Sequence, residues 1–262
     1  MLGFHYPESF TSLQIHGADN YTTAWGDNRR TVFYAPWNGY PSVFIGGEYL
    51  HLGGGNILDL YDEYLQRYLA YQAQGTDVSI DAGAVYLGGT TYQVSVQVCL
   101  DADGDAKTLR VYVANALKYY PGGSYYNHTL MDPAPTSQDV FLQPGECVIL
   151  TRDLTFNAES WNRQSYIEVF AWAQEALDSW PAEIHNAVTL PWPLTHLTPV
   201  GDLNCDGLIN AYDIDGFICA LSPGCDYAGD YPDCDSALAD CNRDGGVNAY
   251  DIDAFIALLA GG

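Results

Sequence analysis

The middle of the chain alternates apolar with polar residues, which is the pattern of a β-strand with one buried face. Turn residues interrupt the alternation, among them Gly88-Gly89 and the acidic stretch 101–105. The runs are short and their connections are brief, which favours antiparallel pairing between neighbours. The predicted strands cover residues 78–86, 92–100, 109–113, 140–142, 147–156, 166–173 and 184–190.

Seven such strands within residues 76–190 are similar to a β-sandwich of the immunoglobulin type. Cys99 and Cys147 both occupy polar positions of their predicted strands. We therefore expect a disulfide between these two strands. After the last strand, Pro191-Trp192-Pro193 and Pro199 indicate a stiff linker over residues 191–198.

Residues 1–75 instead alternate between short strands and helices. A strand at 13–16 and a helix at 23–35 are followed by two strands around Gly46-Gly47. A longer helix is predicted between Asn56, its N-cap, and Gly75, where it ends. It is indicated by a continuous apolar stripe, formed by Ile57, Leu60, Tyr61, Tyr64, Leu65, Tyr68 and Leu69.

This order of elements is similar to the later part of a thioredoxin fold. The likeness rests on Ile15-His16-Gly17 and Tyr40-Pro41-Ser42-Val43, and it implies that Pro41 is a cis-proline. It also implies an earlier central strand and a CxxC motif, yet the first cysteine here is Cys99. We therefore expect a partial thioredoxin-like segment without its CxxC, in a shortened reading of a longer exported protein. Met1 would then be an internal methionine, since no basic and apolar signal peptide follows it.

A thioredoxin-like segment joined to a sandwich resembles a family of bacterial outer-membrane-associated lipoproteins. This likeness spans residues 1–192 and is carried by Asn127-His128-Thr129-Leu130, Arg152-Asp153 and residues 167–172. It implies an exported protein but assigns no chemistry to it.

The last quarter of the chain repeats an acidic loop of twelve residues. The copies begin at Asp202 and Asp240, and each places a carboxylate or amide at positions 1, 3, 5, 9 and 12. This spacing, with Gly at position 6 and a backbone carbonyl at position 7, is typical of EF-hand calcium loops. The predicted ligands of two Ca²⁺ ions are Asp202, Asn204, Asp206, Leu208, Asn210, Asp213, Asp240, Asn242, Asp244, Gly246, Asn248 and Asp251.

Each loop leads into an amphipathic helix. Apolar residues recur at spacings of three and four after both loops. Before the first loop, Pro199-Val200-Gly201 cannot form the entering helix of an ordinary EF-hand. The recurring apolar residues are Ile214, Phe217, Ile218 and Leu221, then Ile252, Phe255, Ile256 and Leu259.

A calcium loop followed by a helix, twice, resembles the dockerin module, a calcium-dependent plug by which bacterial proteins bind cohesin domains. The resemblance covers residues 199–262 and implies a small all-α domain at the end of a multidomain chain. In that family, loop positions 10 and 11 help to select the cohesin, and here they are Ala211-Tyr212 and Ala249-Tyr250. Because the pair is repeated, either helix could present the same face to a cohesin-like partner. The alternative is that calcium only staples a small domain.

Charge and cysteine content narrow the choice of function. A net charge of −24 argues against a nucleic-acid partner, and residues 200–262 contain 12 Asp against one Arg. Five of the seven cysteines lie in this tail, which suggests an extracellular or cell-surface location. From their proximity in sequence we expect Cys225 to pair with Cys234. No apolar stretch is long enough for a membrane span.

The sequence favours an exported, non-catalytic protein that is tethered through its calcium-loaded tail, because it contains no recognisable catalytic set. Two enzymatic alternatives remain open. The first is a component of a polysaccharide-degrading complex, since dockerins commonly carry glycoside hydrolases. The second is a thiol-disulfide oxidoreductase whose CxxC lies upstream. The 21 Tyr and 6 Trp could stack on carbohydrate, although such residues more often fill a sandwich core and its rim.

Overall fold

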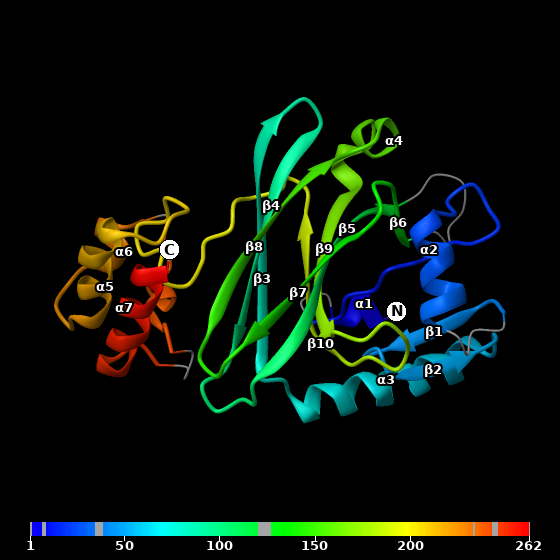
Figure 1. Ribbon diagram of the computed structural model, residues 1–262, viewed down its shortest axis with the longest axis horizontal. Helices are drawn as coiled ribbons and strands as arrows, with labels where there is room; N and C mark the ends of the chain where they lie inside the picture. The colour runs from blue at the N-terminus through cyan, green and yellow to red at the C-terminus, as the bar shows by residue number, and fades with distance from the viewer. Residues whose placement is uncertain are drawn as a thin grey trace.

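The computed structural model describes residues 2–6, 9–34, 39–119, 127–232, 234–242 and 246–261. Its elements lie in layers, from a helical tail through two β-sheets to a mixed layer of helices and a short hairpin (Figure 1). Within the described residues, no helix is both long enough and apolar enough to cross a bilayer.

Two antiparallel sheets form the centre of the molecule. One consists of β3 (Val78–Gly88), β4 (Thr91–Leu100) and β8 (Cys147–Thr155). The other consists of β10 (Ile184–Pro191), β9 (Ile167–Glu175), β5 (Lys107–Tyr119) and β6 (Asn127–Leu130), with β7 (Thr136–Leu142) also paired to β5. The seven strands predicted from the alternation are confirmed. The strand β6 is not among them, because four residues are too few to show the pattern.

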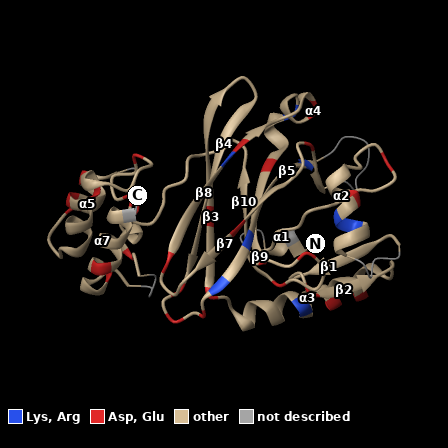
Figure 2. Cartoon of the chain, viewed as in Figure 1, with Lys and Arg blue, Asp and Glu red and all other residues tan. Residues whose placement is uncertain are grey.

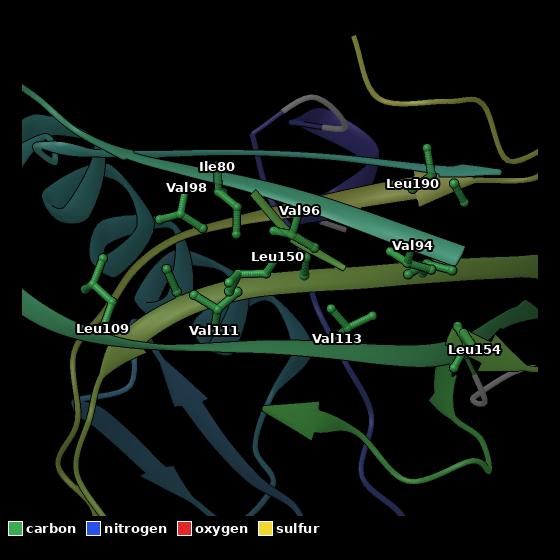
Figure 3. Close-up of a cluster of buried hydrophobic side chains, with 14 of the residues drawn as sticks. Ile80, Val94, Val96, Val98, Leu109, Val111, Val113, Leu150, Leu154 and Leu190 are labelled. Atoms are coloured by element: carbon green, nitrogen blue, oxygen red, sulfur yellow. The ribbon is translucent and has the colours of Figure 1, made fainter. Parts of the chain in front are cut away.

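The inner faces of the two sheets meet in the main core (Figure 3). Val94, Val96 and Val98 of β4 are 0% exposed, and they face Leu109 and Val111 of β5. Alternation along each strand turns these residues to the same side. Burial of each such side chain stabilises the fold by roughly 1.5–3 kcal/mol. This core is the part of the chain to which the other layers attach.

The amino-terminal layer contains α1 (Leu2–His5), α2 (Ala24–Asn28), the π-helical turn η1 (Arg29–Phe33), β1 (Ser42–Ile45), β2 (Tyr49–Leu52) and α3 (Ile57–Gln74). The predicted limits of α3 are confirmed, since the Asn56 side chain accepts a hydrogen bond from the Leu58 amide at 2.9 Å. Gly75 ends the helix with a φ of +70°. The expected cis bond before Pro41 is present.

Two expectations for this layer need correction. The strand expected at 13–16 forms only one parallel bridge, between Gln14 and Thr129, because β6 borders it on one side alone. The helix expected at 23–35 divides into α2, capped by Thr23, and the π-helical turn η1, and Ala35 lies outside the described residues.

Arg29 fastens this layer to the outer face of the larger sheet. The side chain is only 5% exposed. Its Nη1 donates to the Tyr112 hydroxyl at 3.2 Å, and its Nη2 donates to Oε1 of Gln174 at 2.7 Å. The guanidinium also lies 3.4 Å from the centre of the Phe33 ring. Aromatic faces and neutral acceptors thus replace the water that a buried cation loses.

Residues 192–200, here called the strap, lie against the smaller sheet. The Ala84 amide donates to the Thr195 carbonyl at 2.6 Å, and the Val200 amide donates to Oε1 of Gln97 at 3.4 Å. The expected stiff spacer at 191–198 is therefore wrong: residue 191 still belongs to β10, and the rest is packed. Gly83 permits this, since a Cβ there would lie 1.8 Å from the Leu197 nitrogen.

Cys99 and Cys147 are direct partners across β4 and β8, and a disulfide joins them. Their Cα atoms are 4.0 Å apart. Cys99 is only 1% exposed although it lies on the face expected to be polar. On the same face, Gln97 is also 1% exposed where the strap ends, so this face of the sheet is covered in part.

The remaining elements are short helices. A connection from β8 to β9 contains α4 (Ala158–Trp161) and the 3₁₀ turn η2 (Gln164–Tyr166). The tail contains η3 (Ala211–Asp213), α5 (Ile214–Leu221), α6 (Tyr227–Asp230), η4 (Ser236–Ala239), η5 (Ala249–Asp251) and α7 (Ile252–Gly261).

We predict that Gly83→Ala loosens the strap. Its methyl group would overlap the backbone of Leu197, so the variant should lose about 1–3 kcal/mol of unfolding free energy and the strap should be cleaved faster by proteases. The matched control is Gly54→Ala, where a Cβ meets only one atom, at 4.0 Å. Denaturant unfolding and limited proteolysis measure both effects. Unchanged stability and cleavage in Gly83→Ala would show that the strap is not held there.

Candidate calcium and docking site

The first loop of the tail is closed by two buried carboxylates at its ends. Asp202 and Asp213 are both 0% exposed. Oδ1 of Asp213 accepts hydrogen bonds from the Leu203 and Asn204 amides at 2.8 and 3.1 Å, and its Oδ2 accepts one from the Asn210 amide at 2.7 Å. The last carboxylate therefore draws the beginning and the end of the loop together.

The middle of this loop turns its side-chain oxygens back on its own backbone. Asp202 accepts hydrogen bonds from the amides of Asp206 and Gly207 at 3.1 and 2.9 Å. Gly207 has a φ of +89°, and Cys205 has a φ of +56°, so the chain reverses within a few residues. Predicted ligands Asn204 and Asp206 are brought to the same turn, where Asn204 donates to Oδ2 of Asp206 at 3.2 Å.

These residues fit a hard divalent cation. Burial raises the pKa of Asp202 above its ordinary value, against the hydrogen bond from Gly207 and with the nearby charge of Asp213. No Lys or Arg pairs with either carboxylate among the described residues, and the described tail contains red but no blue segments (Figure 2). Buried negative charges require a counter-charge. Because the donors are carboxylates, amide oxygens and a carbonyl, calcium suits them.

The second loop repeats this arrangement where the structure describes it. Asp251 is 0% exposed and accepts hydrogen bonds from the Asn242 and Asn248 amides at 3.1 and 2.8 Å. The Asn248 side chain donates to the Gly246 carbonyl at 2.6 Å, which brings positions 7 and 9 together. Asp240 begins this loop and is partly buried, and the predicted ligand Asp244 lies outside the described residues.

The loops and the helices that follow them share their closing residues. Asn210 and Asp213 form a capping box at the start of η3, and Asn248 and Asp251 form the same box at η5. A capping box satisfies amides that would otherwise lack partners at a helix start. An ion held by Asp213 or Asp251 would therefore fix the direction of α5 or α7.

A small core holds the two repeats against each other. The rings of Phe217 and Phe255 stack with centroids 4.0 Å apart. The Tyr227 hydroxyl donates to the Leu203 carbonyl at 2.8 Å, and burial raises the pKa of Tyr227 to about 12. Leu203 is itself 0% exposed. The inward residues of α5 and α7 are thus used to join the repeats.

The outward residues of both helices leave two similar apolar faces exposed. Tyr212 and Tyr250 are 79% and 81% exposed, and Ile218 and Ile256 are each 56% exposed. The expectation that all apolar residues of each helix share a buried face is wrong. Phe217 is buried, whereas Ile218 points out, because the helix packs along one narrow stripe. The first face consists of Ala211, Tyr212, Ile214 and Ile218, and the second of Ala249, Tyr250, Ile252 and Ile256.

The expected pairing of Cys225 with Cys234 is wrong. The structure joins Cys219 to Cys225 and Cys205 to Cys234, with Cα atoms 5.3 and 5.6 Å apart. Helix α5 brings Cys219 to the turn that contains Cys225, so spatial neighbours differ from sequence neighbours. Cys241 stands outside these disulfides and is buried. Cys205 lies in the first loop, so its disulfide ties that loop to the segment before the second one.

The comparisons with known proteins support the tail. A sequence model of the family described as "Dockerin type I domain" matches residues 200–260. The match supports a dockerin module in this part of the chain, and calcium as its ion. A comparison with curated proteins gives no match.

Three solved structures illustrate the similarity of the rest. HBP35 of Porphyromonas gingivalis is 13% identical, with a TM-score of 0.49 over 67% of this chain and 61% of that chain. A β-glucosidase from Kluyveromyces marxianus is 16% identical, with a TM-score of 0.27 over 47% of this chain and 15% of that chain. The Bifidobacterium adolescentis GH3 β-glucosidase is 20% identical, with a TM-score of 0.25 over 50% and 20%. This chain spans less than two thirds of HBP35, and these scores carry no argument about function.

We predict that the protein binds two calcium ions and that Asp213→Asn or Asp251→Asn removes one. Each change deletes a negative charge at the residue that closes its loop, and the affinity of that loop should fall by at least about tenfold. Isothermal titration calorimetry of the full chain counts the ions. The control is Asp215→Asn, an exposed aspartate of α5 outside the loop. A wild-type stoichiometry below two, or an equal loss in the control, would contradict the assignment.

Proposed function

We propose that this protein is an exported, non-catalytic component that docks through residues 199–262 onto a cohesin-bearing scaffold or cell-surface protein. The observation that carries the proposal is the coupling of each buried carboxylate pattern to a helix with an exposed apolar face. Calcium would fix the loops, the loops would fix the helices, and the helices would present the faces. The three disulfides support an extracellular or cell-surface location.

The two faces support docking in two orientations. Tyr212 and Tyr250 occupy the same loop position, and Ile218 and Ile256 follow at the same distance. Their exposed fractions agree within two percentage points for each pair. A partner that fits one face would therefore meet nearly the same surface after half a turn. Ala211 and Ala249 leave room beside each tyrosine, and the surrounding aspartates favour a partner with basic groups at its rim.

The other parts of the chain are proposed to present the docked cargo. We divide the chain into a partial thioredoxin-like segment at 1–75, an immunoglobulin-like sandwich at 76–190, and the dockerin-like domain. The cis-proline at 41 followed by a hairpin and a long helix supports the first assignment. The two packed antiparallel sheets support the second.

Calcium-dependent capture by cohesins tests the proposal. The full chain should bind at least one immobilised cohesin from a panel in calcium, and EDTA should release it. Circular dichroism in EDTA should show a loss of helix from α5 and α7 while the β-sheet signal remains. Binding that is indifferent to EDTA, or the absence of binding across a broad panel with calcium-loaded protein, would refute the docking function.

We predict that one face alone is sufficient for binding. Tyr212→Ala with Ile218→Ala should leave affinity within a few-fold, as should Tyr250→Ala with Ile256→Ala, because the intact face can still dock. All four substitutions together should weaken binding by at least about a hundredfold, since exposed aromatic and aliphatic anchors dominate such interfaces. Ile149→Ala on β8, 42% exposed, is the control. Surface plasmon resonance with the captured cohesin gives these affinities. A full loss from one pair alone would show a single docking orientation.

A further inference from the structure

A cavity of about 880 Å³ lies between the amino-terminal layer and the outer face of the larger sheet. Phe170 and Trp172 of β9 line it on the side of the sheet. Residues 10–17 line it along one wall, and residues 40–46, which include β1, line it along another. The cavity is therefore bordered by two extended segments of backbone.

The first of these segments is hydrogen bonded on one side only. The Gln14 amide donates to the His128 carbonyl at 2.9 Å, and the Gln14 carbonyl accepts from the Leu130 amide at 2.9 Å. Both backbone groups of Gln14 thus face β6. In an extended chain the neighbouring residues turn theirs the opposite way. Leu13 and Ile15 make no backbone hydrogen bond to the described residues.

The second segment, β1, has one described strand partner. It pairs with β2 from Ser42 opposite Leu52 to Ile45 opposite Tyr49. In an antiparallel pair, alternate residues point their amides and carbonyls away from the partner. The two walls of the cavity therefore both carry strand edges without a neighbouring strand among the described residues. Half-buried backbone groups of this kind need partners.

The volume fits one short strand. Adjacent strands lie about 4.8 Å apart, packed layers about 10 Å apart, and each residue rises about 3.3 Å, so a buried strand residue occupies roughly 160 Å³. The cavity of about 880 Å³ would then hold five or six residues. This length matches β1, which has four residues, and the wall at 12–16.

The lining also sets the chemistry of the occupant. Phe170 and Trp172 lie on one side of the cavity, and Leu2 and Tyr64 from α1 and α3 also line it. A strand between such surfaces is covered on both faces, and such strands are continuously apolar. Leu2 opens α1 and is 6% exposed, so a segment joined to the amino end of α1 would start at the cavity wall.

We propose that this cavity is a strand-insertion site. Its occupant is an extended apolar segment of five or six residues, attached to the same polypeptide through α1, which pairs with residues 12–16 on one side and with β1 on the other. The insertion would join the single bridge at Gln14 and the hairpin β1–β2 into one continuous sheet. Its backbone would satisfy the amides that now face the cavity.

The experiment adds such a strand to the full chain. Val-Leu-Val-Ile-Val, followed by a flexible Gly/Ser linker of about twelve residues, is fused before Met1. The matched control fusion carries Val-Pro-Val-Pro-Val, whose prolines cannot donate to a ladder. Thermal unfolding and amide hydrogen exchange are measured on both fusions and on the unmodified chain. The unmodified chain is also mixed with the free peptide Val-Leu-Val-Ile-Val, made soluble by terminal lysines.

We expect the first fusion to raise the Tm by several degrees and to slow exchange at Leu13, Ile15 and β1 by at least about tenfold. The proline fusion should change neither. Equal effects of both fusions, or no effect of the first, would overturn the proposal, because the cavity would then not accept a strand. Protection by the free peptide without protection by the fusion would overturn the attachment to the same chain.

Discussion

Carboxylates without a cationic partner in a buried loop are the constraint on which the docking part of this protein depends. Asp202, Asp213 and Asp251 are fully buried, and no described Lys or Arg pairs with them. Amide hydrogen bonds hold their oxygens in place but do not neutralise them. A divalent ion supplies the missing charge, and it does so at the residues that also start η3 and η5. Ion binding, helix direction and the orientation of the exposed faces are therefore one event rather than three.

The strap makes this event relevant to the rest of the molecule. A flexible linker would let the tail turn freely, whatever the state of its loops. Here the Thr195 carbonyl and the Val200 amide bind β3 and β4, and the second of these contacts lies two residues before Asp202. The first calcium loop thus begins where the sandwich ends. A docked tail would hold the sandwich, and the layer fastened to it by Arg29, in a defined orientation to the partner.

The sequence predicts the parts of this structure that depend on local pattern, and it fails where distant segments meet. Alternation of Val94, Val96 and Val98 located β4, and Asn56 and Gly75 marked both ends of α3, because strand faces and helix caps are local. The loop ligands followed from spacing alone. Pairing of Cys205 with Cys234 required the fold of α5 and α6, and the outward direction of Ile218 required the narrow packing of Phe217 on Phe255. The strap was misjudged because the decisive residue, Gly83, lies on another element more than a hundred positions away.

The size of the tail explains why it combines ions with disulfides. A domain of about sixty residues buries only about 60% of its unfolded surface and is marginal on its core alone. This tail also carries 12 Asp against one Arg between residues 200 and 262, so self-repulsion opposes its compact state. The disulfides Cys205–Cys234 and Cys219–Cys225 span 29 and 6 residues. In the chain-entropy account they contribute roughly 3.5 and 2.5 kcal/mol. That sum is comparable with the total stability of a small domain, so the disulfides hold the chain near its fold while the ions set the loops.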